Sequence, residues 1–205
     1  MKYDAIVVAG GLGKRADLGQ NKVLYKMKNG KTVIETSCHL FIEDEDCQKV
    51  ILVINDDIDF DSDKVMIVEG GKERFDSVAN GLKEVSAEYV LIHDGARPFL
   101  DKEDLESVKK EVTIHEAEIL AKKSTNTIKY SKDGFIEKTI DRNNIYEAET
   151  PQAFKTDLIK EVYKNLTGVI TDDAYLVEKT GRKVKLVESK HKNCKLTSKE
   201  DFENL

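Results

Sequence analysis

The segment most able to do chemistry follows the apolar run Ala5–Ala9, which is typical of a buried parallel strand. The run leads directly into a glycine-rich turn and then into cationic side chains. The glycines are Gly10, Gly11 and Gly13, and the cations are Lys14, Arg15 and Lys22. Glycine lets the backbone approach a large anion closely with its N–H groups pointing at phosphate oxygens. Arg15 and Lys22 can neutralise the remaining charge, so the pattern predicts a polyphosphate-binding loop. The spacing matches neither a Walker loop nor Gly-x-Gly-x-x-Gly, and a plain tight turn is the alternative.

A second glycine pair, Gly70 and Gly71, comes directly after the apolar run Val65–Val68. Asp76 or Ser77 could cap a helix there, with the apolar positions after it buried. Such a helix preceded by a turn is the simpler interpretation, but it leaves the glycine pair unexplained. A close-approach site for a planar base is the other interpretation.

A third segment, His93–Pro98, closes the apolar strand predicted over residues 89–93. A carboxylate at the end of a buried strand is where an α/β fold places a metal ligand, and Asp94 stands beside Gly95 at that point. Mg²⁺ binds one or two carboxylates together with ligand phosphates, so one aspartate is sufficient. The alternative is that Asp94 caps the loop and pairs with Arg97.

These segments need a scaffold, and the rest of the chain predicts an α/β domain with a mostly parallel sheet. Predicted strands are Ala5–Ala9, Val50–Ile54, Val65–Val68, Tyr89–His93, Glu118–Ala121 and Lys183–Val187. Predicted helices are Val33–Ile42, Asp76–Glu84, Lys102–Val112, Lys155–Asn165 and Asp172–Thr180. Residues 122–150 differ from this alternation, because Ile128–Ile140 reads as a hairpin with a glycine-bearing turn. A lone hairpin is marginally stable, so we expect this arm to pack against a second subunit.

Composition limits the remaining possibilities. The 205 residues suffice for one domain over 1–205, and the net charge of -6 argues against a general nucleic-acid surface. No apolar run approaches membrane-spanning length, and a strand predicted almost at the first residue leaves no room for a signal peptide. Three scattered cysteines favour a reducing, cytoplasmic setting. Since no nucleophile–histidine pair stands out, the chemistry is predicted to be positioning and charge neutralisation.

Taken in order, the motifs resemble the 2-C-methyl-D-erythritol 4-phosphate cytidylyltransferase family of isoprenoid biosynthesis. The motifs are Ala9–Arg15, Gly70–Val78, His93–Pro98, Asp141–Asn143, Thr150–Phe154, Thr171–Ala174 and Asn193–Thr197. The resemblance implies a Rossmann-like nucleotidyltransferase with a protruding β-arm, a homodimer, and Mg²⁺-dependent transfer of CMP from CTP to a polyol phosphate.

The resemblance also implies roles for individual residues. The catalytic group would be Arg15, Lys22 and Lys195. The nucleotide-binding group would be Ala9, Gly10, Gly11, Lys14, Gly71, Ser77 and Gly95. The acceptor-binding group would be Asp94, Arg97, Thr127, Arg142, Thr150 and Thr171, with Asp94 also close to the metal and Thr127 and Arg142 supplied by the partner's arm.

Some positions depart from the family pattern. Asn21 and Val23 flank Lys22 where the family usually has proline and glutamine, Lys72 replaces a frequent acidic residue, and Asn126 replaces an aspartate. The nearest alternative is a ribitol-5-phosphate cytidylyltransferase, whose relatives tend to show Asp-Ser/Ala-Val-Arg-Pro where this chain has Asp94-Gly-Ala-Arg-Pro. A non-catalytic nucleotide-binding protein is the alternative from another class, and the retained cations argue against it.

Overall fold

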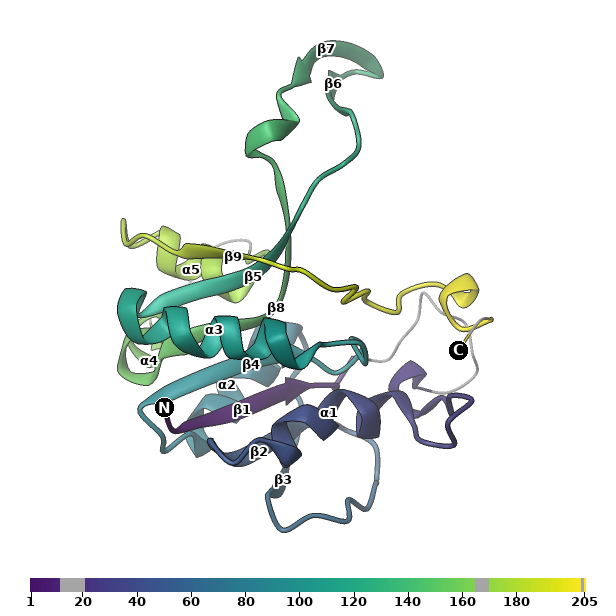
Figure 1. Ribbon diagram of the computed structural model, residues 1–205, viewed down its shortest axis with the longest axis vertical. Helices are drawn as coiled ribbons and strands as arrows, with labels where there is room; N and C mark the ends of the chain where they lie inside the picture. The colour runs from purple at the N-terminus through teal and green to yellow at the C-terminus, as the bar shows by residue number, and fades with distance from the viewer. Residues whose placement is uncertain (12–20, 165–169, 204) are drawn as a thin grey trace.

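The computed structural model describes residues 1–11, 21–164, 170–203 and 205. Its body is a seven-stranded sheet in the order β3-β2-β1-β4-β8-β5-β9, from which a two-stranded arm projects (Figure 1). The strands of the sheet are β1 (Tyr3–Val8), β2 (Cys47–Val53), β3 (Val65–Val68), β4 (Tyr89–Asp94), β5 (Ala117–Lys123), β8 (Tyr146–Lys155) and β9 (Lys185–Glu188). The Rossmann-like α/β prediction is confirmed.

One strand runs against the others. β8 is antiparallel to both β4 and β5, whereas β1, β2, β3 and β4 are mutually parallel and β5 is parallel to β9. β8 was not among the strands predicted from the sequence. The register of β1 and β4 places Val8 opposite Asp94, so the carboxyl ends of these two central strands lie side by side.

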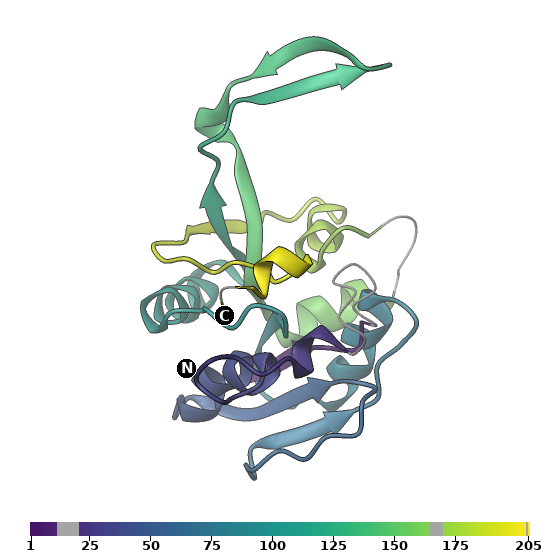
Figure 2. The same ribbon diagram turned by 90° about the vertical axis from the view of Figure 1, so that its right-hand side faces the viewer.

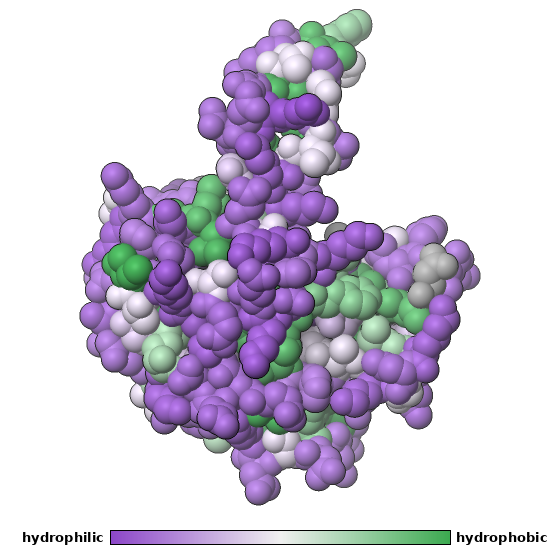
Figure 3. Space-filling view, viewed as in Figure 1, coloured by the Kyte–Doolittle hydropathy of each residue, from purple (hydrophilic) through white to green (hydrophobic). Residues whose placement is uncertain are grey.

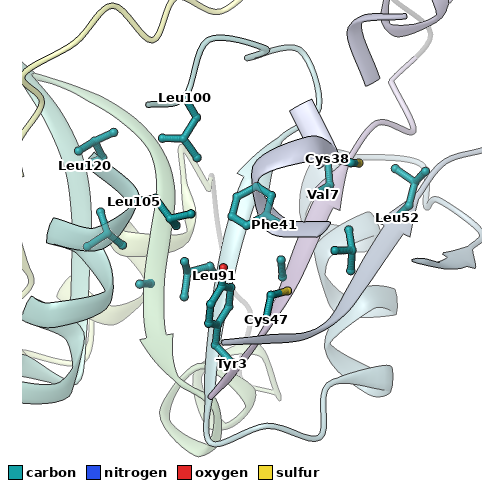
Figure 4. Packing of buried hydrophobic residues seen from close by; sticks show 14 of the residues in the cluster. Tyr3, Val7, Cys38, Phe41, Cys47, Leu52, Leu91, Leu100, Leu105 and Leu120 are labelled. Atoms are coloured by element: carbon teal, nitrogen blue, oxygen red, sulfur yellow. The ribbon is translucent and has the colours of Figure 1, made fainter. Parts of the chain in front are cut away.

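Helices cover both faces of the sheet, and two buried apolar clusters separate them from it. One face carries α1 (Val33–Glu43) and α3 (Lys102–His115). The other carries α2 (Arg74–Glu84), α4 (Thr156–Lys164) and α5 (Asp173–Glu178). Figure 4 shows Tyr3, Phe41 and Leu91 meeting in the first cluster, and all three side chains are fully buried. This core fixes the strand ends on which the site stands.

The arm stands clear of the body in Figures 1 and 2. It consists of β6 (Ile128–Lys132) and β7 (Phe135–Ile140), joined through Asp133 and Gly134, both with positive φ. Such a turn matches the right-handed twist of a hairpin. The hairpin prediction is therefore confirmed, and the arm is continuous with the outer ends of β5 and β8, where Lys123 is paired with Tyr146.

Three short 3₁₀ helices complete the described part of the chain: η1 (Lys22–Leu24), η2 (Arg142–Asn144) and η3 (Lys199–Asp201). In the portions of the chain that the structure describes, no helix has the length and apolar character needed to cross a bilayer.

The start of α2 differs from the prediction. The helix begins at Arg74, with Glu73 as its N-cap, rather than at Asp76 or Ser77. Asp76 is instead the third helical residue, and its carboxylate accepts a hydrogen bond from the Glu73 N–H at 3.1 Å. A carboxylate at either position stabilises a helix start, so the sequence pattern did not separate the two possibilities.

Candidate active site

A cleft of about 660 Å³ opens where the carboxyl ends of β1 and β4 meet the start of α2. This volume is within the usual range for a small-molecule site. Eight residues predicted from the sequence line it: Ala9, Gly10, Gly11, Lys22, Gly71, Ser77, Asp94 and Lys195. Lys14 and Arg15 lie outside the described residues, so their predicted roles stay predictions.

The two glycine segments both line this cleft and approach each other closely. A Cβ on Gly10 would lie 3.3 Å from the Ser77 Oγ and 3.4 Å from the Gly70 Cα. At Gly71 a Cβ would be only 2.1 Å from the Asp76 Cβ, so no larger residue fits without moving the start of α2. Glycine is therefore required by packing at this turn, and its small size keeps the backbone open to the cleft.

Hydrogen bonds hold the second glycine segment in place. The Ser77 hydroxyl accepts from the Gly71 N–H at 3.0 Å and lies 3.2 Å from the Glu73 carbonyl, to which it donates. The Asn55 carboxamide accepts from the Gly70 N–H at 2.8 Å and lies near the Gly10 carbonyl, 3.4 Å away. Asn55 was not predicted as a site residue. Polar residues directly after a buried parallel strand are the signal that could have revealed it.

Asp94 is the electrostatic centre of the cleft. Its carboxylate oxygens lie 3.1 Å from the Arg74 Nε and 2.7 Å from the Lys195 Nζ, while the Arg97 Nε is at 3.6 Å. Burial alone would raise the pKa of Asp94, but these three cations outweigh burial and hold the pKa below its ordinary value. The group is therefore an anion at neutral pH, and it fixes the positions of its cationic neighbours.

Arg74 lines the cleft but was not predicted as a site residue from the sequence. Besides Asp94, its guanidinium contacts the Asp173 carboxylate at 2.8 Å, and Asp173 is fully buried at the start of α5. The Tyr163 hydroxyl donates a short hydrogen bond to the same carboxylate. Arg74 thus joins α2, β4 and α5 at the wall of the cleft, using the planar fork that arginine offers to two carboxylates.

Lys22 and Lys195 come from distant parts of the chain and meet at the same rim. The Lys22 Nζ donates to the Leu196 carbonyl at 2.6 Å, directly beside Lys195. The Leu196 N–H in turn donates to the Ala96 carbonyl at 2.9 Å, which fixes this segment against the loop after β4. Both lysines consequently line the same cleft as Asp94, and the Lys195 amine contacts its carboxylate.

Polar residues behind Asp94 support it. The Thr150 hydroxyl accepts from the Asp94 N–H at 3.1 Å and contacts the His93 Nδ1 at 3.0 Å. Burial is the main reason why the pKa of His93 falls to about 4, so its ring is neutral at pH 7. Arg97 donates to the Asn193 carbonyl at 2.6 Å, and the Asn193 amide donates to the Thr150 carbonyl at the same distance. Arg97 and Thr150 are therefore buried supports here, and their predicted contacts with the acceptor stay predictions.

Close packing explains why position 95 is a glycine. A Cβ there would lie 2.8 Å from the Ile34 Cδ1 and 3.1 Å from both the Ala9 Cβ and the Val8 carbonyl oxygen. Its N–H donates to the same Val8 carbonyl at 2.9 Å. Gly95 therefore allows β1, β4 and α1 to approach, whether or not it also contacts a ribose.

Three further predicted residues, Thr127, Arg142 and Thr171, do not line the cleft. Thr171 is exposed shortly before α5, and Thr127 and Arg142 are exposed near the base of the arm. Arg142 donates to the Thr125 carbonyl at 2.6 Å and lines a separate hollow of about 480 Å³ that also contains Lys122 and Lys123. Neither arm residue lines the cleft of its own chain, and their predicted contacts with a partner's acceptor site stay predictions.

In the described ranges, no three His, Cys, Asp or Glu side chains gather as a metal-binding group. Asp94 and Glu73 are the carboxylates that line the cleft. Each Asp94 oxygen has two lone pairs, so its contacts with Arg74 and Lys195 leave acceptor capacity for a cation that is held mainly by phosphates. The donor set therefore fits Mg²⁺ and offers no cage made of protein ligands alone.

A Rossmann-like sheet with a cationic, glycine-lined cleft at the carboxyl ends of its central strands is typical of a nucleotide-binding protein of the α/β class. Comparison with known proteins identifies the family. The model of the family described as IspD, 2-C-methyl-D-erythritol 4-phosphate cytidylyltransferase, matches residues 3–204, and the chain belongs to this family.

Individual relatives agree with this assignment. The chain is 39% identical to the 2-C-methyl-D-erythritol 4-phosphate cytidylyltransferase of Geobacillus kaustophilus, over 98% of this chain and 94% of that protein. It is 40% identical to the protein of the same name from Shouchella clausii, with the same coverage. The solved 4-diphosphocytidyl-2C-methyl-D-erythritol synthase of Anaerococcus prevotii superposes with a TM-score of 0.85 at 31% identity, covering 98% of this chain and 93% of that one. The family resemblance of the motifs is thus confirmed.

Proposed function

We propose that the chain transfers CMP from CTP to 2-C-methyl-D-erythritol 4-phosphate and releases pyrophosphate. The observation that carries the proposal is that Lys195 and Arg74 bind the Asp94 carboxylate in a cleft that Lys22 and the two glycine segments also line. Family membership supports the donor and the acceptor, since the relatives carry this activity in their names.

The reaction is an in-line displacement at the α-phosphorus of CTP. An oxygen of the acceptor's phosphate forms the new P–O bond, the bond between the α-phosphorus and its bridging oxygen breaks, and pyrophosphate leaves. An acceptor phosphate is ionised near neutral pH, so no general base is needed, and the neutral, buried His93 agrees with this. Lys22, Lys195 and Arg15 would stabilise the charge that develops on the transferred group.

Mg²⁺ is the expected cofactor. Asp94 would hold it together with oxygens of the triphosphate, and the bound cation would neutralise phosphate charge. The anionic state of Asp94 in this structure supports that role.

Cytosine selectivity would come from the glycine segment at the start of α2. The tight packing at Gly71 and Ser77 supports a small pocket that excludes purines. We expect CTP to be preferred clearly over ATP and GTP, because polar groups left unpaired by the wrong base are costly. Comparable turnover with ATP would show that this segment does not bind the base.

The working form would be a homodimer built through the arm. The arm carries exposed apolar side chains, Tyr130, Phe135 and Ile136, and Figure 3 shows apolar surface at its tip. Exposed apolar residues gathered on a projecting hairpin favour burial against a second copy. Thr127 and Arg142 of each arm would then complete the acceptor site of the other subunit.

Subunit mixing tests the shared site. Lys22→Ala and Arg142→Ala should each be nearly inactive alone, whereas their mixture should regain activity, because some heterodimers have one site that carries neither substitution. If mass spectrometry confirms subunit exchange and the mixture stays inactive, the site is not shared.

The cysteines bear on where the protein acts. The three free thiols, Cys38, Cys47 and Cys194, support action in a reducing cytoplasm.

The kinetic test of the mechanism uses Lys22→Ala with saturating CTP. Loss of a donor that acts in the transition state costs about 3 kcal/mol, or about a hundredfold in kcat, with little change in CTP affinity. A variant with near-normal kcat and much weaker CTP binding would assign Lys22 to ground-state binding instead.

A further inference from the structure

Asn21 occupies a structurally critical position immediately before Lys22. Its Nδ2 donates to the Asp56 Oδ2 at 2.6 Å and lies 3.3 Å from the Ala9 carbonyl, and its Oδ1 accepts from the Val23 N–H at 3.3 Å. One side chain therefore links the end of β1, the loop after β2 and the first turn of η1. Ala9 and Asn21 stand on either side of the predicted phosphate loop in the sequence, and this contact holds its two ends together.

Asp56 gives this arrangement its strongest contact. It lies in the loop directly after β2, a strand whose residues Val50–Val53 are fully buried, so the carboxylate is presented from a rigid base. A short hydrogen bond to an ionised carboxylate is worth about twice a neutral one. The Asp56 contact is therefore the main restraint on the Asn21 side chain.

Lys22 is held between two fixed points. Asn21 precedes it in the sequence, and Val23, which is 3% exposed and packed into the core, follows it. The 3₁₀ turn is closed by the Leu24 N–H donating to the Asn21 carbonyl at 2.9 Å. The direction in which the Lys22 side chain leaves the backbone depends on both points, and its amine reaches the Leu196 carbonyl at 2.6 Å.

We propose that Asn21 and Asp56 form a positioning pair that sets Lys22 in its working orientation. The inference rests on the role of Lys22 in the proposed function. Neither residue of the pair lines the cleft, so the pair acts through Lys22 and not through contact with the substrates.

The backbone of Asn21 suggests a way to separate this role from general stability. Its φ of -60° and ψ of 122° are values that proline adopts readily. Asn21→Pro would therefore fix the same backbone conformation without needing Asp56. Asp56→Asn retains an oxygen that can accept from Asn21 but removes the charge, whereas Asp56→Ala removes both.

The experiment is a kinetic cycle with CTP, acceptor and Mg²⁺, with folding confirmed by circular dichroism. Asn21→Ala and Asp56→Ala should each lower kcat about tenfold with the KM for CTP within about twofold, because a small misplacement of a charged donor affects the transition state most. The double variant should be no slower than the slower single variant, since both changes remove one interaction. Asp56→Asn should keep most of the activity, and Asn21→Pro should make kcat insensitive to Asp56→Ala.

Asp57→Ala is the matched control, because it removes a neighbouring exposed carboxylate. Equal kcat values for Asp56→Ala and Asp57→Ala would overturn the proposal, as would an Asp56→Ala effect of the same size in the Asn21→Pro enzyme. A wild-type enzyme that releases no pyrophosphate would instead contradict the proposed function.

A readout that does not depend on turnover completes the test. Acetylation of Lys22, followed by peptide mass spectrometry, should become several-fold faster in Asp56→Ala than in the wild type, while the exposed Lys26 should react at an unchanged rate. Unchanged Lys22 labelling would contradict the positioning role even if kcat fell.

Discussion

Arg74→Met removes the guanidinium that joins Asp94 to Asp173 while keeping a long side chain. Removing one partner of a buried ion pair costs about 3–5 kcal/mol, because the other charge is left without compensation. Asp173 is fully buried, so the Arg74–Asp173 contact resembles such a buried ion pair. The Arg74 side chain is 31% exposed, however, so water can replace part of the lost contact.

Two retained contacts lower the expected cost further. Asp94 keeps the Lys195 amine at 2.7 Å, and Asp173 keeps the hydrogen bond from the Tyr163 hydroxyl. Arg74→Met removes one hydrogen bond to each carboxylate, and both carboxylates keep another partner, so we expect a loss of about 2 kcal/mol in the free energy of unfolding. For a chain of this length the melting temperature should fall by about 6 °C.

Urea unfolding followed by circular dichroism measures this loss at neutral pH. The control is Lys83→Met, which removes a cation from an exposed position on the same helix, where its amine contacts Asn80 at 2.9 Å. We expect the control to change stability by less than about 0.5 kcal/mol. If the two variants unfold at the same urea concentration, Arg74 does not join α2, β4 and α5 in the way described. A kcat loss should accompany the stability loss in Arg74→Met, because Asp94 and Lys195 lose a fixed neighbour.

Other predictions concern groups whose surroundings are equally well defined. Glu118 is fully buried, and burial, reinforced by Glu111, raises its pKa from 4.5 to about 9. Its folded-state pKa lies above the unfolded value, so the folded state loses stability as pH rises from 4.5 towards 9. Glu118→Gln should therefore be near neutral at pH 4 and stabilising by about 3 kcal/mol at pH 7 in denaturation curves, and a gain independent of pH would contradict the shift. Asn55→Ala should raise the KM for CTP several-fold with little change in kcat, because the Asn55 side chain links the Gly70 N–H to the Gly10 carbonyl. A change in kcat alone would show that Asn55 acts on the transition state and not on CTP binding. Gly95→Ala should lower the melting temperature because its methyl group would lie 2.8 Å from the Ile34 Cδ1, and an unchanged melting temperature would show that the strand ends can separate.

The alternation of apolar runs and helices was sufficient to predict the α/β fold and the hairpin. It was not sufficient for β8, because Pro151 interrupts the segment and its partners, β4 and β5, are far away in sequence. Strand pairing of that kind depends on tertiary contacts, which local patterns do not contain.

The glycine segments and Asp94 could be predicted as site residues because each directly follows a predicted buried strand, whereas Lys195 was indicated only by the family resemblance of its motif. Arg74 was missed because the start of α2 was placed two residues too late, which left the arginine in a turn. Asn21 was seen only as a departure from the family pattern. The structural role of Asn21 depends on its hydrogen bond to Asp56, which is 35 residues away in the sequence and lies beside Asn21 only in the folded chain.

The central claim is tested most directly by ³¹P NMR of the purified chain with CTP, Mg²⁺ and one polyol phosphate at a time. With 2-C-methyl-D-erythritol 4-phosphate, we predict stoichiometric formation of pyrophosphate and of a new diphosphodiester that contains the α-phosphorus of CTP. With ribitol 5-phosphate, turnover should be much slower. No pyrophosphate with the first acceptor, or faster turnover with the second, would contradict the assignment.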